Sequence, residues 1–131
     1  MTTHLFETEL WLPTAREKIF PFFADARNLE TITPPWLEFR ILTPGQIPMC
    51  AGTLIDYRLR IHGWPVGWRT KITGWNPPES FCDEQLRGPY RRWRHTHTFT
   101  ARAGGTLCHD RVEYAVPGGA LVNRLFVRRE V

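Results

Sequence analysis

Polar and apolar side chains alternate along most of the chain, which is the pattern of half-buried strands. The clearest run is 92–99, RWRHTHTF, in which Trp93, His95, His97 and Phe99 share one parity and arginines and threonines share the other. Successive side chains of a strand point to opposite faces of the sheet. We therefore expect an aromatic and imidazole face that looks inward and a basic, hydroxylated face that looks to water.

The same alternation predicts further strands on both sides of this run. They cover residues 4–12, 38–43, 53–62, 66–75, 80–86 and 106–116. Glycine and proline turn signals separate the later strands about every ten to fifteen residues, which is typical of an antiparallel meander.

A helix is predicted over residues 15–24, where apolar side chains recur at helical spacing. Thr14 and Glu17 at its start have the spacing of a capping box, in which each side chain bonds the backbone of the other residue. Pro21 should distort the middle of this helix.

Two more segments are expected to be helical. A short helix runs from Asn28 through Ile32 and stops before Pro34, and a final helix covers residues 120–131. The predicted order is therefore strand, two helices, about six antiparallel strands and a helix, an α+β architecture. A long meander needs its apolar face covered, and the final helix is the late element able to do so.

Composition narrows the class of protein. The 131 residues are 42% hydrophobic, with six tryptophans and eight phenylalanines, and carry a net charge of +4. We expect one domain over 1–131 with a wide aromatic core, no membrane span, and no basic leader that would export the chain. The three cysteines form no CxxC pair, so we expect reduced thiols in the cytoplasm.

Candidate chemistry gathers on the inward face of strand 92–99. His95 and His97 can anchor a ligand by hydrogen bonds, act as general acid and base, or be satisfied structurally by neighbouring strands. Asp83 and Glu84 put carboxylates on both faces of one short strand, so either one of them faces inward or both are solvated on a surface strand. A buried carboxylate must be paired or protonated, which makes a contact between Asp83 and a histidine the natural hypothesis. Asp110 shares the parity of Val112 and can also face inward.

A metal site needs more ligands than the two histidines supply. His-x-His spacing occurs in zinc sites, but zinc takes about three or four protein ligands. Asp83, Asp110 or Cys108 can join only if their strands align, so we predict no metal and no cofactor.

Large side chains at the inward-facing positions of several predicted strands form a candidate wall for a flat or polycyclic ligand. They are Tyr57, Leu59, Trp68, Trp93, Phe99 and Tyr114. Ordinary core packing is the alternative for these side chains. The arginines around residues 87–94 can contact RNA or form a solvated face, and the prediction is no nucleic-acid partner.

Five segments resemble the START/SRPBCC superfamily, in particular its bacterial polyketide cyclase/dehydrase-like and coenzyme Q-binding branches. They are 28–36 (NLETITPPW), 52–57 (GTLIDY), 81–85 (FCDEQ), 88–99 (GPYRRWRHTHTF) and 110–117 (DRVEYAVP). The resemblance implies a helix-grip (Bet v 1/START-like) fold, β-α-α-β(6)-α, with a cavity between a curved sheet and the last helix. It identifies the fold better than the activity, because such folds host carriers, sensors and enzymes.

Three functions follow as hypotheses. The first is a ligand-binding protein that holds a lipid, quinone or polyketide-like molecule. The second is a cyclase or dehydratase that uses His95 or His97 as acid and base, with Asp83 orienting the histidine. The third is a protein-interaction module, because residues 120–131 make only a short lid, so that the cavity stays open or a homodimer partner closes it.

Overall fold

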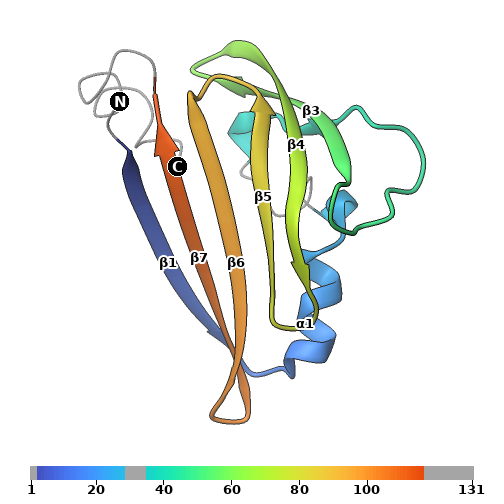
Figure 1. Ribbon diagram of the computed structural model, residues 1–131, viewed down its shortest axis with the longest axis vertical. Helices are drawn as coiled ribbons and strands as arrows, with labels where there is room; N and C mark the ends of the chain where they lie inside the picture. Colours follow the sequence, from blue (N-terminus) through green and yellow to red (C-terminus); the bar gives the residue numbers. More distant parts are fainter. Residues whose placement is uncertain (1–2, 29–34, 117–131) are drawn as a thin grey trace.

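An antiparallel seven-stranded sheet dominates the computed structural model, which describes residues 3–28 and 35–116 (Figure 1). The sheet order is β1-β7-β6-β5-β4-β3-β2, so the first strand lies beside the last. The strands are β1 (His4–Leu12), β2 (Arg40–Ile41), β3 (Leu54–Ile61), β4 (Trp64–Asn76), β5 (Ser80–Arg87), β6 (Arg92–Arg102) and β7 (Gly105–Ala115). The predicted meander is confirmed, although β2 is shorter than residues 38–43.

The β6–β7 turn meets the end of β1 at Gly105. A Cβ atom there would lie 2.2 Å from the carbonyl oxygen of Leu12 and 2.7 Å from the ring of Trp11, so only glycine fits without displacement. The indole Nε1 of Trp11 donates a hydrogen bond to the carbonyl oxygen of Arg102 at 2.9 Å. These contacts hold β1 against the end of the hairpin.

Helix α1 (Arg16–Phe23) begins one residue later than predicted, and the capping box is wrong. Its N-cap is Ala15, which makes no side-chain cap. The carbonyl oxygen of the preceding Thr14 instead accepts a hydrogen bond from Oγ1 of Thr106 at 2.6 Å. A tertiary contact with β7 therefore sets the entry into the helix. Pro21 lies within the helix, as expected.

Phe20 attaches α1 to the concave face of the sheet. Its ring meets the rings of Trp75, Phe81 and Phe99 edge-on, at centroid distances of 5.3, 5.7 and 5.4 Å. The cluster around it consists of Ile19, Phe20, Ala24, Phe81, Phe99 and Cys108. Helix α1 thus covers the concave face where β5, β6 and β7 supply these side chains.

A second core cluster occupies another part of the concave face. It consists of Leu37, Leu59, Trp68, Tyr90, Val112, Tyr114 and Val116. Leu37 comes from the short 3-10 helix η2 (Pro35–Leu37), while the other side chains come from the sheet and its turns. The two clusters leave room between them for the site described below.

The other two predicted helices fall largely outside the residues that the structure describes. A 3-10 helix, η1 (Ala26–Asn28), stands where the helix 28–32 was expected to start, and residues 29–34 lie outside the described part. The final helix over 120–131 lies outside it as well, so its role as lid stays a prediction. Neither α1 nor the 3-10 helices have the length and apolarity needed to cross a membrane.

Arginines and lysine on the outward parity lie on the convex face, as predicted. Arg58, Arg60, Lys71 and Arg94 are exposed. Nε of Arg69 lies 2.7 Å from Oδ1 of Asp56, across the β3–β4 pair. Acidic neighbours interrupt the basic face, which favours the interpretation of a solvated surface.

Candidate functional site

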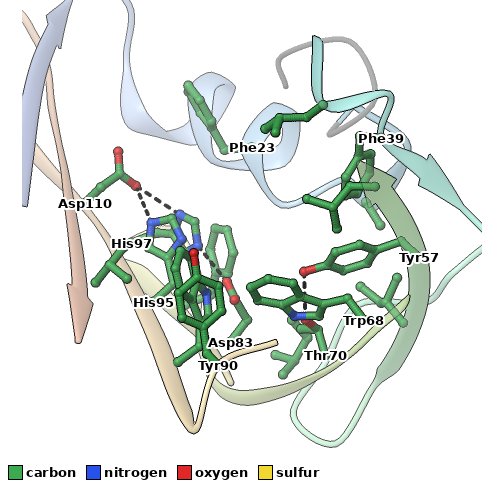
Figure 2. A pocket seen from close by; sticks show the side chains of 18 of the residues that line it. Phe23, Phe39, Tyr57, Trp68, Thr70, Asp83, Tyr90, His95, His97 and Asp110 are labelled. Atoms are coloured by element: carbon green, nitrogen blue, oxygen red, sulfur yellow. Dashed lines mark hydrogen bonds and ion pairs between the residues drawn. The ribbon is translucent and has the colours of Figure 1, made fainter. Parts of the chain in front are cut away.

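A pocket of about 470 Å³ opens on the concave side of the sheet (Figure 2). Strands β1 and β3 to β7 supply most of its wall, and α1, η1, η2 and the connecting loops add the rest. Eight of the ten predicted ligand-binding residues line it: Tyr57, Leu59, Trp68, Asp83, Trp93, His95, His97 and Asp110. Its volume falls in the range of about 300–1,000 Å³ that small-molecule sites occupy.

The other two predicted residues, Phe99 and Tyr114, support the pocket without lining it. Phe99 is 3% exposed and packs against Phe20 of α1. Tyr114 is 3% exposed and packs against Tyr90 and Trp93. Strand parity correctly predicts which face of the sheet a side chain lies on. It does not predict whether other side chains cover that position and separate it from the pocket.

Several lining residues were missed by the sequence analysis. Thr70, Phe81, Phe6 and Thr8 share the inward parity of their strands, so the signal was present and could have been used. Tyr90 enters from the turn between β5 and β6, where its backbone pairs with the side chain of Gln85. Phe39 and Met49 come from loops, for which alternation gives no guidance.

The polar part of the pocket is one hydrogen-bonded chain of four side chains. His97 donates from Nε2 to Oδ2 of Asp83 at 2.8 Å, and its Nδ1 lies 3.2 Å from Oδ1 of Asp110. His95 shares that Asp110 oxygen through its Nε2 at 3.0 Å. The register explains the meeting, because Asp83 lies opposite His95 and His97 lies opposite Asp110. The predicted contact between Asp83 and a histidine is found.

The ring of His97 is held between two other rings. Phe81 stacks on one side at a centroid distance of 4.1 Å and an angle of 12°, and His95 stacks at 3.7 Å and 24°. With both nitrogens bonded to carboxylates, the imidazole can neither rotate nor tilt without losing contacts. The site therefore presents its polar groups in a fixed orientation.

The hydrogen bonds among these side chains determine the charges of His97 and Asp110. Burial disfavours the charged form of His97, but its hydrogen bonds to Asp110 and Asp83 outweigh this and raise its pKa to about 9. Burial likewise opposes ionisation of Asp110, while hydrogen bonds from His95 and His97 hold the pKa of that carboxyl well below its usual range. At neutral pH an imidazolium thus lies between two carboxylates.

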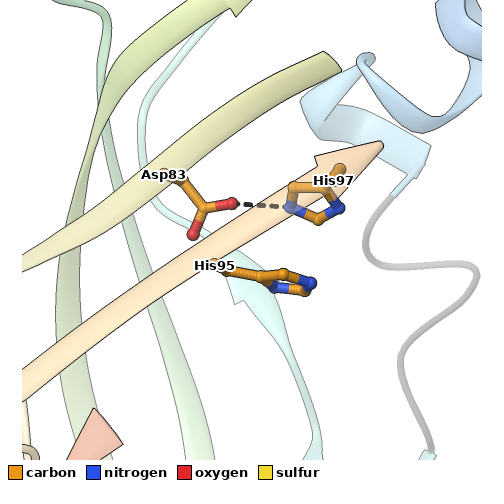
Figure 3. A group of neighbouring side chains, drawn as sticks. All are labelled: Asp83, His95 and His97. Atoms are coloured by element: carbon orange, nitrogen blue, oxygen red, sulfur yellow. Dashed lines mark hydrogen bonds and ion pairs between the residues drawn. The ribbon is translucent and has the colours of Figure 1, made fainter. Parts of the chain in front are cut away.

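Asp83, His95 and His97 also meet the distance requirement for a metal site, with ligand atoms within 4.8 Å of one another (Figure 3). The two imidazole rings, however, are stacked at 24°, so one ion cannot lie in the plane of both. Both nitrogens of His97 are already bonded to carboxylates. This geometry suits hydrogen bonding and proton transfer better than metal binding. Cys108 packs in the cluster beneath α1 and is not part of the group.

Aromatic rings form the apolar wall, with Trp68 at its centre (Figure 2). Tyr57 stacks on Trp68 at 5.7 Å, and Trp93 meets it edge-on at 5.2 Å. The hydroxyl of Tyr57 bonds Oγ1 of Thr70 at 3.1 Å, and burial raises the pKa of Tyr57 far above its usual value, so the phenol is neutral. The indole Nε1 of Trp68 is buried without a hydrogen-bond partner among the described residues.

Solved structures with this architecture include proteins from bacteria and a plant. A Streptomyces sp. R1128 aromatase/cyclase, Zhui, shares 14% identity at a TM-score of 0.70, covering 93% of this chain and 73% of its own. A point mutant of Thalictrum flavum norcoclaurine synthase, with a transition-state analogue, shares 15% at 0.71, with coverage of 99% and 84%. The protein TTHA0849 from Thermus thermophilus shares 17% at 0.70, with coverage of 96% and 82%.

At these identities the likeness shows the fold alone, which is the predicted helix-grip fold. No curated protein sequence matches the chain. The sequence does match, over residues 12–130, the family described as polyketide cyclase / dehydrase and lipid transport. The match spans nearly the whole length and agrees with the fold and the pocket. The chain therefore belongs to this family, within the START/SRPBCC superfamily.

Proposed function

We propose that the protein binds a flat, mostly hydrophobic small molecule that carries a polar group. The pocket itself supports this most strongly: about 470 Å³ of space, walled by aromatic rings and containing one polar cluster. Apolar walls with a few placed polar groups are the usual composition of small-molecule sites. Aromatic walls favour a planar ligand, because stacked rings add to the energy of buried area.

The unpaired indole N–H of Trp68 supports the same proposal. A buried donor without a partner costs about 1–3 kcal/mol, and native structures rarely leave one unsatisfied. A carbonyl or hydroxyl oxygen on a bound molecule would accept this hydrogen bond. The ligand then contacts an aromatic wall, an indole donor and the Asp83–His97 pair.

A bulky substitution at the pocket's edge tests the proposal. Thr8 on β1 lines the pocket and is exposed, so Thr8→Trp adds a ring to the space and gives up only the 3.5 Å hydrogen bond from Oγ1 of Thr8 to Oδ2 of Asp110. We expect naphthylmethanol, a neutral aromatic alcohol, to bind the wild type and to bind Thr8→Trp at least about tenfold more weakly by titration calorimetry. Equal affinities for the two proteins would show that the alcohol does not occupy this pocket.

Glu9→Trp is the matched control. Glu9 follows Thr8 on the same strand and is exposed, and its parity points it to the opposite face. We expect its affinity to equal that of the wild type. Native mass spectrometry of gently purified protein then identifies whatever natural molecule the pocket retains.

A second candidate function is acid–base catalysis of cyclase or dehydratase type. This function is favoured by the continuous series of side-chain contacts from Asp83 through His97 and Asp110 to His95. Such a series can hold a proton and pass it on. The aromatase/cyclase and the norcoclaurine synthase above have the same fold and are enzymes by name. Neither name identifies this chain's substrate.

Incubation with a linear poly-β-ketone thioester, followed by mass spectrometry, separates the two functions. An enzyme of this type releases a cyclised, dehydrated product, and His97→Gln should reduce its rate at least about a hundredfold, within the usual contribution of a general acid or base. Unchanged ketone recovered from the wild type at all pH values would leave binding as the function.

A further inference from the structure

We propose that the pocket selects its ligand by charge: it prefers an aromatic molecule with an ammonium group, accepts one with a hydroxyl group, and rejects one with a carboxylate. This inference rests on the proposed binding function and specifies the chemical class of ligand. It depends on which charged side chains line the space and which do not.

The described lining of the pocket carries acidic side chains but no permanently charged base. Asp83 and Asp110 line it together with His95 and His97, and no lysine or arginine is among the described lining residues. Both imidazoles contact Oδ1 of Asp110, and His97 also bonds Oδ2 of Asp83, so these contacts leave Oδ1 of Asp83 unused. The basic residues of β3, β4 and β6 lie on the convex face, on the other side of the sheet. The described part of the lining thus holds none of the arginines and lysines that give the chain its net charge of +4.

Asp83 supplies an acceptor that a ligand can use. Its Oδ2 bonds His97, and its Oδ1 has no hydrogen-bond partner in the part of the chain that the structure describes. The Asp83 side chain is 17% exposed, so water screens its charge only weakly. The charge also acts across the pocket, because it contributes to the raised pKa of Tyr57. An ammonium or hydroxyl group of a ligand can donate a hydrogen bond to Oδ1, so that both oxygens of this carboxylate then accept one.

The aromatic wall next to Asp83 suits the same cation. Trp68, Tyr57 and Trp93 all line the pocket. Figure 2 shows the ring of Trp68 next to Asp83, with Tyr57 beyond it. The negative face of an aromatic ring attracts a cation within about 6 Å, and tryptophan does so best. A carboxylate ligand would instead place a second acceptor against Oδ1 of Asp83 and against the electron-rich rings. Repulsion of like charges in a partly buried site therefore opposes fatty acids and aromatic acids.

Three probes of one shape test this selection. Naphthylmethylamine is cationic at pH 7, naphthylmethanol is neutral and naphthoate is anionic. We expect the amine to bind the full chain tightest, the alcohol next, and naphthoate at least about tenfold more weakly than the amine by titration calorimetry. Naphthoate binding as tightly as the amine, or the alcohol binding tighter than the amine, would overturn the inference and leave the proposed function intact. Failure of all three to bind would count against the proposed function itself.

Asp83→Asn identifies the source of the preference. It removes one charge with little change of shape, and we expect the amine-to-naphthoate affinity ratio to fall to within about threefold of unity. Glu84→Gln is the matched control, because Glu84 is the next residue on β5 and has the opposite parity. Its ratio should equal that of the wild type. An unchanged ratio in Asp83→Asn would refute the assignment, and if that variant fails to fold by circular dichroism, the three-probe comparison on the wild type decides.

Discussion

Replacing Phe20 with alanine is expected to lower the free energy of unfolding by about 3–5 kcal/mol, the usual cost of removing a fully buried phenylalanine. The ring is 4% exposed and contacts Trp75, Phe81 and Phe99, which belong to three different strands. Its loss leaves a cavity where α1 meets the sheet. Urea denaturation followed by circular dichroism measures the change.

Phe22→Ala provides the control for this prediction. Phe22 lies two residues after Phe20 on the same helix but is 43% exposed, and its ring meets that of its neighbour Phe23 edge-on. We expect a cost below about 1 kcal/mol, as for most exposed substitutions. Similar costs at Phe20 and Phe22 would show that α1 does not bind the sheet through Phe20. Since Phe23 lines the pocket, Phe20→Ala should also weaken the binding of naphthylmethanol.

The stability of the protein is expected to fall as the pH rises from about 6.5 through 9. The pKa of His97 is raised from 6.5 to about 9, so between these values the folded state binds a proton that the unfolded chain has lost. Stability decreases with pH wherever the folded state binds more protons. The contribution is complete below pH 6.5 and is lost above pH 9. The shift corresponds to about 3 kcal/mol at most.

Urea denaturation at a series of pH values, on the wild type and on His97→Gln, tests this expectation. The variant lacks the titrating group, so its stability should change much less over this range. The comparison also removes the contribution of Cys108, whose pKa burial raises. His109→Gln is the matched replacement of a histidine on the other face of the sheet, where His109 pairs with Glu7, and the change of slope in His97→Gln is judged against it. Parallel curves for the wild type and His97→Gln would contradict the assigned charge of His97.

The alternation along β6 predicted the face of the site because strand parity is a local property. A side chain two positions from another must share its face, whatever the rest of the chain does. Trp93, His95 and His97 therefore line the pocket as expected. The contact of Asp83 with a histidine followed from the cost of leaving a buried carboxylate unpaired, whereas the pattern did not show whether Asp83 or Glu84 faces inward.

Contacts between distant segments could not be predicted in the same way. His95 and His97 both contact Oδ1 of Asp110, and this depends on the register of β6 against β7. That register is fixed in turn by the hairpin at 102–105 and by the fit of Gly105 against β1. The capping prediction at Thr14 failed for a related reason, because the hydrogen bond from Oγ1 of Thr106 on β7 to the carbonyl oxygen of Thr14 is a contact between distant segments, and the N-cap is Ala15.

The pairing of β1 with β7 has a consequence for synthesis of the protein on the ribosome. His4 lies opposite Tyr114, so β1 is translated long before the strand with which it pairs. Contacts between such distant segments form slowly, because a long loop must be closed first. Phe6 and Thr8 of β1 line the pocket, so its wall is complete only once β7 has emerged. A nascent chain stalled before β7 should be unable to retain ligand, even with the central strands already translated.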